Sequence, residues 1–222
     1  MKDYEVIAFD IDGTLYPSWR LNIVVLPYFL SHLPFFLRLN AVRKTMRQSA
    51  PSPDFFEYQA RLLAEKQRCT PAEAKAQIQT LIYDGLKPYF EKIKTFKYVE
   101  ETFQKLKAAG YRIALLSDFP PEQKGSLWGL IPYCELMMGT EEIGALKPSK
   151  YPFGILAMKL KVTPDKILYV GNSKKYDVIG ARNAGLKTAY LQPLWKRLLH
   201  IPCHEADISF GSYRQFQKLV LQ

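Results

Sequence analysis

The chain has 222 residues, of which 31 are Lys or Arg and 21 are Asp or Glu, so its formal net charge is +10. Hydrophobic residues make up 48% of the sequence, and this fraction excludes a disordered chain because it can bury enough surface to offset the entropy of ordering. The length suits one domain, or a core domain that carries an insertion.

Cysteine usage and charge limit the classes of protein further. Cys69, Cys134 and Cys203 are odd in number and far apart, which excludes a disulfide framework and favours a reducing compartment. The first residues show no signal-peptide pattern, so we expect a cytoplasmic protein. The positive charge is compatible with nucleic acid, anionic lipid or a small anionic substrate, and composition does not choose among them.

Strand and helix patterns alternate along most of the chain. Residues 6–9 form a continuous apolar run, typical of a strand buried on both faces of a parallel sheet. The alternation predicts an α/β fold built on a doubly wound parallel sheet. Further strands are expected at 112–116, 135–138 (the weakest), 167–170, 188–191 and 207–210, with helices at 99–109 and 151–160, through Ala181, and from Ser212.

Residues 16–95 break this alternation. They contain no strand pattern of comparable quality but several helical ones, the clearest being the capping box Thr70-Pro71-Ala72-Glu73. A structureless loop of this length is uncommon in a compact domain. We therefore predict a helical subdomain at 16–95, inserted between the core segments 1–15 and 96–222.

Acidic and polar side chains follow three of the predicted strands. In a doubly wound sheet, ligands bind outside the carboxyl ends of the strands. Crowded carboxylates repel one another unless a cation binds them, and hard oxygen ligands suit Mg²⁺, which commonly accompanies phosphate. The residues concerned are Asp10 and Asp12, then Ser117 and Asp118, then Asn172 and Asp177.

Four short motifs, in order, resemble those of the haloacid dehalogenase superfamily, most of whose members are phosphohydrolases. The segment DIDGTL at 10–15 resembles the D-x-D-G-T-L signature. Ser117 ends a buried strand as the second motif does, Lys147 precedes a proline as in the third, and GNSKKYD at 171–177 resembles the fourth. The resemblance implies a Rossmann-like core, and it implies that the insertion forms a cap over the active site.

The resemblance also implies roles for individual residues. Asp10 is expected to be the nucleophile that attacks phosphorus and forms an aspartyl-phosphate. Asp12 is expected to be the general acid for the leaving oxygen, then the general base for the hydrolytic water. Ser117, assisted by Asp118, is expected to hold phosphoryl oxygens, while Lys147 binds the phosphoryl group and neutralises charge on it and on Asp10.

A Mg²⁺ cofactor is implied in the same way, held by Asp10, the carbonyl of Asp12, and Asp177. The fourth motif often begins Gly-Asp, whereas this chain has Asn172. Its amide oxygen can accept a hydrogen bond from a metal-bound water but brings no charge. We therefore count Asn172 in the metal site and expect weaker Mg²⁺ binding with activity retained.

The implied activity is a Mg²⁺-dependent phosphatase acting on a small phosphorylated metabolite. Asp12 favours phosphoryl transfer over dehalogenation, because the dehalogenases of the superfamily lack this second carboxylate. A phosphotransferase or mutase with the same intermediate, and a non-catalytic binding protein of this fold, stay open as alternatives. No base-reading motif or regular basic stripe with stacking aromatics occurs, so we expect no nucleic-acid partner.

The stretch 21–37 in the insertion contains no charged residue and is rich in Val, Leu, Phe and Ile. Pro27 and Pro34 interrupt it, and its length is at the short limit for a membrane span, so we reject a transmembrane helix. Our main interpretation is a pair of short helices in the core of the insertion. An apolar lining for a hydrophobic phosphate ester, or a contact surface for a membrane or an oligomer, are the alternatives.

Overall fold

Six parallel strands form one sheet in the order β3-β2-β1-β4-β5-β6. The computed structural model describes residues 4–222. Each predicted strand is confirmed to within one residue at either end, and so is the α/β fold class. The strands are β1 (Val6–Phe9), β2 (Arg112–Ser117), β3 (Leu136–Gly139), β4 (Ile167–Gly171), β5 (Lys187–Leu191) and β6 (Ile208–Phe210).

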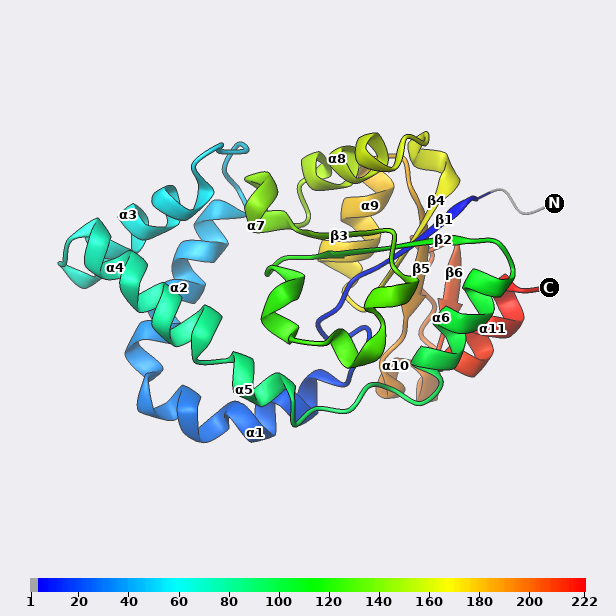
Figure 1. Cartoon of the computed structure of the whole chain (residues 1–222), viewed down its shortest axis with the longest axis horizontal. Coiled ribbons are helices and arrows are strands. Elements are labelled where there is room, and N and C mark those ends of the chain that lie inside the picture. The colour runs from blue at the N-terminus through cyan, green and yellow to red at the C-terminus, as the bar shows by residue number, and fades with distance from the viewer. Residues whose placement is uncertain (1–3) are drawn as a thin grey trace.

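Helices fill the connections between the strands (Figure 1). The α-helices are α1 (Ser18–Ser31), α2 (Leu33–Met46), α3 (Phe55–Gln67), α4 (Pro71–Ile78), α5 (Lys87–Phe90), α6 (Val99–Ala108), α7 (Thr140–Ile143), α8 (Lys150–Leu160), α9 (Ile179–Asn183), α10 (Leu194–Leu198) and α11 (Tyr213–Val220). Shorter turns of π-helix are η1 (Gln79–Asp84) and η6 (Lys174–Val178), and those of 3₁₀-helix are η2 (Pro121–Lys124), η3 (Leu127–Gly129), η4 (Ile131–Tyr133) and η5 (Pro164–Lys166).

Strand β1 is buried on both faces, as its unbroken apolar run predicts. Successive side chains point to opposite sides of a sheet, so Ile7 and Phe9 pack in one core with α6 and α11. Val6 and Ala8 pack in the other core with α8 and α9. Figure 1 shows these two helix pairs on opposite sides of the sheet. The central position of β1 follows, because only an inner strand can be covered on both faces.

The order of the strands determines where a ligand can bind. The chain runs from β1 to β2 and β3 on one side, then returns to β4 on the other side of β1. Phe9 lies opposite both Leu115 of β2 and Val170 of β4. The carboxyl ends of β1, β2 and β4 therefore lie side by side, at the switch point where doubly wound sheets bind ligands.

Helices α1 to α5 and the η1 turn all lie between β1 and β2, and residues 16–95, which are all described, contain no strand. Figure 1 shows them grouped at the end of the molecule beyond the carboxyl ends of the strands. Helices α2, α3 and α4 and the η1 turn share a hydrophobic cluster, which includes Val42 and Leu63 and to which Leu146 of the core also contributes. The Thr70 capping box is present, with Thr70 and Glu73 bonded reciprocally at the start of α4. The division of the chain at 15/16 and 95/96 stays a prediction.

Helix α1 differs from its predicted environment. Residues 21–37 do fall in two helices, and α2 places Phe35 in the core of the insertion. None of the fourteen residues of α1 is buried, however, so the packed-core interpretation is wrong for that helix. Helix α1 is therefore an apolar helix at the surface. Hydrophobic periodicity predicts a helix but does not show whether another part of the chain packs against it.

Helix length and hydropathy show whether any helix within residues 4–222 could span a membrane. No single helix there is long and apolar enough to cross a bilayer. Helices α1 and α2 reach the required length and hydropathy only when they are taken together, and they are bent by 110° at their junction.

Candidate active site

Asp10 follows β1 directly and is buried. Its backbone N–H donates to the carbonyl of Val170 at 2.9 Å, which extends the β1–β4 pairing by one residue. Thr14 Oγ1 donates to Asp10 Oδ2 at 2.7 Å, and Lys147 Nζ donates to Oδ1 at 2.6 Å. Burial raises the pKa of Asp10 to about 7 against the attraction of Lys147, and the charges of Asp177 and Asp12 add to the rise. Two hydrogen bonds thus hold the Asp10 carboxyl group in place, but the charge of Lys147 does not fully offset burial and the two neighbouring carboxylates.

The turn after Asp10 requires glycine at position 13. Gly13 has φ +83°, a left-handed conformation that side chains with a Cβ rarely adopt. A Cβ at this position would also lie 2.2 Å from Asn172 Nδ2 and 2.4 Å from Ser18 Oγ. Gly13 therefore allows the chain to turn closely past the loop that follows β4.

Asp12 lies beyond the end of β1 and accepts hydrogen bonds on both of its oxygens. Tyr16 Oη donates to Oδ1 at 2.5 Å, and Ser117 Oγ donates to Oδ2 at 3.0 Å. Lys124 Nζ lies 3.3 Å from Oδ2. Burial raises the pKa of Asp12, but Lys124 and the hydrogen bonds from Tyr16 and Ser117 outweigh it and hold the pKa below its ordinary value. Asp12 is therefore an anion in the free protein, the form that accepts a proton from water.

Lys147 is a buried cation between two buried carboxylates. Its Nζ lies 2.6 Å from Asp10 Oδ1 and 2.8 Å from Asp177 Oδ1, and it donates to the hydroxyl of Tyr169 at 3.1 Å. Burial lowers the pKa of Lys147, but the two carboxylates reverse this effect and hold it well above its ordinary value. The ammonium group therefore stays charged, and it joins the ends of β1 and β4.

The loop after β4 brings Asp177 to the site. Ser173 N–H donates to Asp177 Oδ2 at 2.9 Å, and Asp177 N–H donates back to the carbonyl of Ser173 at 3.0 Å. A Cβ on Gly171 would lie 2.3 Å from the Cβ of Asp177, so the glycine gives this side chain its space. Asn172 Oδ1 accepts from Thr14 Oγ1 at 3.4 Å, which places its amide beside the first motif.

Ser117 and Asp118 end strand β2. Ser117 is buried, and its hydroxyl is bonded to Asp12. Asp118 Oδ1 accepts from Thr140 Oγ1 at 2.9 Å and from the Lys147 N–H at 3.1 Å. Its Oδ2 accepts from Arg47 Nη2 at 2.6 Å. These contacts indicate a residue that positions the Lys147 loop, and a direct contact of Asp118 with phosphate stays a prediction.

Two arginines reach the core from the insertion, Arg43 of α2 and Arg47, which caps the end of that helix. Arg47 donates to Asp118 and to the carbonyl of Lys147. Arg43 is buried, pairs with Glu141 of α7, and leaves its Nη2 without a hydrogen-bond partner within residues 4–222. Sequence reasoning missed both. Their spacing of four residues puts them on one helix face, but no sequence signal shows that this face meets the end of β2.

Sequence reasoning also missed three other polar groups of the site. Tyr16 and Lys124 hold Asp12, and Tyr169 accepts from Lys147 and donates to the carbonyl of Leu116 at 2.8 Å. Tyr16 follows the first motif and was within reach of sequence reasoning. Lys124 and Tyr169 do not follow a motif in the sequence. Only the packing of the sheet brings them close to the site.

A cavity of about 370 Å³ opens at the carboxyl ends of the central strands. The predicted residues Asp10, Asp12, Asp118, Lys147, Asn172 and Asp177 all line it. Ser117 is bonded to Asp12 behind the cavity surface. The insertion contributes the opposite side, with Leu21, Leu86 and Phe90 beside the two arginines. The cavity therefore joins a polar end formed by the sheet to a more apolar end formed by the insertion.

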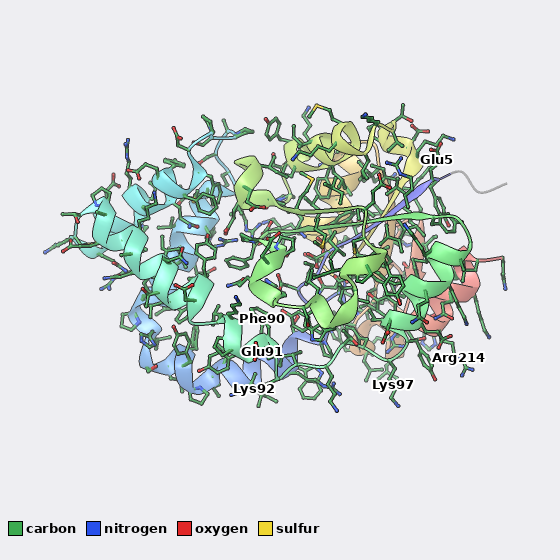
Figure 2. All side chains as sticks on the ribbon, in the orientation of Figure 1. Glu5, Phe90, Glu91, Lys92, Lys97 and Arg214 are labelled. Carbon is green, nitrogen blue, oxygen red and sulfur yellow. The ribbon has the colours of Figure 1, made fainter. Side chains whose placement is uncertain are left out.

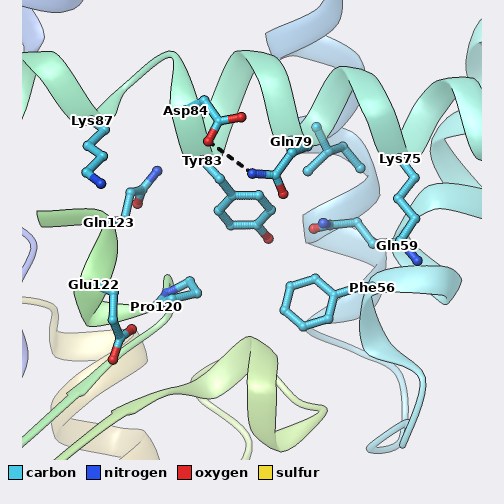
Figure 3. A pocket seen from close by; sticks show the side chains of 11 residues that line it. Phe56, Gln59, Lys75, Gln79, Tyr83, Asp84, Lys87, Pro120, Glu122 and Gln123 are labelled. Atoms are coloured by element: carbon cyan, nitrogen blue, oxygen red, sulfur yellow. Dashed lines mark hydrogen bonds between the residues drawn. The ribbon is translucent and has the colours of Figure 1, made fainter.

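A second cavity, of about 480 Å³, lies farther into the insertion and is shown in Figure 3. Phe56, Gln59 and Tyr83 line it, and the Gln79–Asp84 hydrogen bond of 3.1 Å crosses its rim. Gln123 lines both cavities. This second cavity is the larger of the two but contains none of the predicted site residues. The candidate active site is therefore identified by its carboxylates and its lysine and not by its volume.

The oxygen atoms of the site suit a hard divalent cation. Within residues 4–222, no three His, Cys, Asp or Glu side chains gather as ligands for one ion. Mg²⁺ needs fewer, since it keeps several waters and binds through one or two carboxylates plus substrate phosphate. Asp10 and Asp177 approach the same Lys147 Nζ within 2.8 Å, and the raised pKa of Asp10 shows that more positive charge would favour its ionised form. The residues therefore fit Mg²⁺.

The fold and the site define the class, an α/β protein with a doubly wound parallel sheet and a polar site at the carboxyl ends of its central strands. The chain matches the haloacid dehalogenase-like hydrolase family over residues 4–185 and belongs to that family.

Its curated relatives include enzymes named as phosphatases. It is 23% identical over 237 residues to the phosphoglycolate phosphatase of Salmonella paratyphi A, with 96% of this chain and 91% of the relative covered. It is 28% identical over 200 residues to the glyceraldehyde 3-phosphate phosphatase of Methanopyrus kandleri, with 85% and 84% covered.

Among solved structures, the hydrolase YfnB of Bacillus subtilis, bound to magnesium, superposes with a TM-score of 0.69. The two chains are covered over their whole lengths at 14% identity. Such a likeness shows the fold alone.

Proposed function

We propose that this protein is a Mg²⁺-dependent phosphatase that hydrolyses a small phosphorylated metabolite through an aspartyl-phosphate. One observation carries the proposal: Asp10 and Asp12 line one cavity, where Asp10 is bonded to a buried lysine and Asp12 is held as an anion. The phosphatases among the relatives support the substrate class.

The first step transfers the phosphoryl group to Asp10. A carboxylate oxygen of Asp10 forms the new bond to phosphorus as the ester P–O bond breaks, and the leaving oxygen takes a proton from Asp12. Asp12 acquires that proton when the dianionic phosphate binds beside it and raises its pKa. Tyr16 and Ser117 hold the carboxyl group in position throughout, because each donates to a different oxygen.

The second step regenerates the enzyme. Asp12, again an anion, takes a proton from water as the water oxygen attacks phosphorus. The bond between phosphorus and Asp10 then breaks, which releases inorganic phosphate and the Asp10 carboxylate. Lys147 stabilises the charge that Asp10 regains, since its ammonium group lies 2.6 Å from Oδ1.

The metal would be held by Asp10, the carbonyl of Asp12, and Asp177, with Asn172 contacting a metal-bound water. When bound, Mg²⁺ supplies positive charge that screens the anionic phosphate from the anionic carboxylates. The neutral amide of Asn172 adds none of the negative charge that would tighten this binding.

The shape of the cavity supports a small substrate with an apolar part. Its volume of about 370 Å³ lies at the low end of the range for small-molecule sites. Leu21 and Phe90 offer apolar contacts, whereas Arg43 offers its Nη2 as a hydrogen-bond donor, since among the described residues this atom has no hydrogen-bond partner and lies 4.0 Å from Asp118 Oδ2. Because this arginine lies at the insertion end, it would bind an acidic group of the substrate other than the transferred phosphate.

A phosphotransferase or mutase would use the same intermediate with an alcohol in place of water. Measuring released phosphate against phosphate transferred to added sugars distinguishes the two, since transfer without release would favour the transferase. A non-catalytic protein would show neither.

The direct test is hydrolysis of an aryl phosphate with and without Mg²⁺ by the natural chain and by Asp10→Asn. Asp165→Asn is the matched control, because Asp165 lies in the η5 turn away from the cavity. We expect Asp10→Asn to lose activity by at least about a thousandfold and Asp165→Asn to retain it. Acid quenching should trap an acyl-phosphate on the natural chain and on Asp165→Asn, but not on Asp10→Asn. Activity that survives Asp10→Asn would exclude Asp10 as the nucleophile.

A further inference from the structure

Helix α1 presents a row of apolar side chains to solvent. Trp19, Ile23, Leu26 and Leu30 recur at steps of four, three and four residues, which places them on one helix face. They are 59%, 62%, 51% and 58% exposed, respectively. A surface helix of a globular protein normally turns such a stripe toward the core, so the stripe of α1 points to a partner outside the chain.

A second exposed apolar group lies on and just after α10. Leu194, Trp195, Leu198 and Leu199 are each more than half exposed, with Leu198 reaching 68%. Trp19 and Leu194 line the same cleft, so the two groups are neighbours although about 170 residues separate them. Figure 1 shows α1 and α10 along the same lower edge of the molecule. We call these eight side chains the α1–α10 surface.

The charge around the α1–α10 surface is positive. The Arg20 guanidinium lies 5.4 Å from the ring centre of Trp19, and Lys196 Nζ lies 5.5 Å from that of Trp195. Neither residues 16–53 nor residues 192–204 contain an Asp or Glu. Arg20 also shares a cleft with Lys94 and Lys97, to which Glu100 and Glu101 contribute the opposite charge. Figure 2 shows Lys92 and Lys97 along this lower edge, with Glu91 beside Lys92.

We propose that the α1–α10 surface binds the interface of a bilayer that contains anionic lipid, with α1 lying in the plane of the membrane. Tryptophan is enriched at the level of the lipid headgroups, and leucine and isoleucine insert just below them. Arginine and lysine next to the tryptophans attract anionic headgroups. Each exposed tryptophan of this surface has such a cation adjacent to it, which is the arrangement that an anionic interface favours.

A second copy of the chain fits this surface less well. A twofold interface places the same patch on both subunits. Arg20 and Lys196 of both copies would then lie in one interface, and neither α1 nor α10 offers a carboxylate to pair with them. A bilayer supplies negative charge and apolar depth together, so it matches both properties of the surface.

Membrane binding would place the catalytic cavity close to the lipid. Ser18, at the start of α1, and Asn172 line both the catalytic cavity and the cleft that contains Trp19 and Leu194. Leu21 and Asn22 of α1 also line the catalytic cavity. The proposal concerns binding alone, however, and it does not depend on the phosphatase activity.

The test is sedimentation of the full chain with two kinds of vesicles, phosphatidylcholine alone and phosphatidylcholine mixed with phosphatidylglycerol. We expect binding to the mixed vesicles at low salt, at least about tenfold stronger than to phosphatidylcholine, and weaker binding at high salt. Fluorescence of Trp19 and Trp195 should shift to the blue and be quenched by brominated lipid. No binding to the mixed vesicles, or equal binding to both kinds, would overturn the proposal.

Paired variants distinguish binding through the α1–α10 surface from nonspecific hydrophobic adsorption. The double variant Ile23→Ser/Leu198→Ser should lose binding by about tenfold or more. Met158→Ser is the control, because Met158 is 63% exposed on α8 at the far side of the sheet. The double variant Arg20→Gln/Lys196→Gln should lose the preference for anionic lipid. Circular dichroism and aryl phosphatase activity should match the natural chain in every variant.

Two results would replace the bilayer by another partner. A concentration-dependent dimer that Ile23→Ser/Leu198→Ser abolishes, without vesicle binding by the natural chain, would assign the surface to a second copy. Vesicle binding that these substitutions leave unchanged would move the lipid contact elsewhere on the molecule.

Discussion

Replacing Lys147 by methionine removes the only side-chain cation that the described residues place against both Asp10 and Asp177. Its Nζ lies 2.6 Å from one carboxylate and 2.8 Å from the other. Methionine keeps an unbranched apolar side chain but leaves two buried negative charges uncompensated. Removing one partner of a buried ion pair typically costs about 3–5 kcal/mol, and we expect a loss of stability in this range at alkaline pH.

The loss of stability in Lys147→Met should depend on pH in a defined direction. The pKa of Asp10 in the folded chain is about 7, above its ordinary value of 3.8. The folded state therefore binds more protons than the unfolded state between these values, and the stability that this group contributes falls as pH rises across the window. Loss of Lys147 raises the pKa of Asp10 further. The destabilisation should thus be small at about pH 5 and largest at about pH 8.

Urea unfolding of the natural chain and of Lys147→Met at these two pH values measures the effect. Lys150→Met, at an exposed position on α8, is the matched control and should unfold as the natural chain does. Added Mg²⁺ should restore part of the stability of Lys147→Met, because a cation again lies between the carboxylates. Equal stability of Lys147→Met and the natural chain at about pH 8 without Mg²⁺ would refute the reasoning.

Three further substitutions test separate parts of the site. Tyr16→Phe removes the 2.5 Å hydrogen bond to Asp12, so the pKa of Asp12 should rise and move the acidic limb of the kcat profile, which reports Asp12 as the base for water, to higher pH; an unmoved limb would contradict the role of Tyr16. Asn172→Asp should lower the Mg²⁺ concentration needed for half-maximal activity by about tenfold, and an unchanged value would place this residue outside the metal site. Arg47→Ala breaks the link from α2 to Asp118, and steady-state kinetics should show KM raised about tenfold or more, whereas an unchanged KM would make this link purely structural.

Local patterns in the sequence were sufficient for much of the fold. The strands are short apolar runs, and each run indicates a buried strand whichever strands lie next to it. The capping box at Thr70 and the turn at Gly13 are also local, because their hydrogen bonds and dihedral angles involve residues close in the chain. The motif at 10–15 placed Asp10 and Asp12 together for the same reason.

Contacts between distant segments were beyond such patterns. The bond from Lys147 to Asp10 spans 137 residues, and the motifs indicated that both residues matter without showing that the lysine also contacts Asp177. Lys124 and Arg47 had no motif at all. Their roles depend on which loops the strand order brings side by side, and hydrophobic periodicity does not encode strand order.

Helix α1 shows most clearly which properties the sequence determined and which the tertiary structure decided. The sequence by itself determined that residues 21–37 are apolar and that basic residues flank them. Only the tertiary structure decided that the first of the two helices has no buried residue while the second packs in the insertion. The physical reason is that burial depends on a facing surface, and a helix reaches its partner only after distant segments have packed. The same fact leaves α1 free to contact something outside the chain.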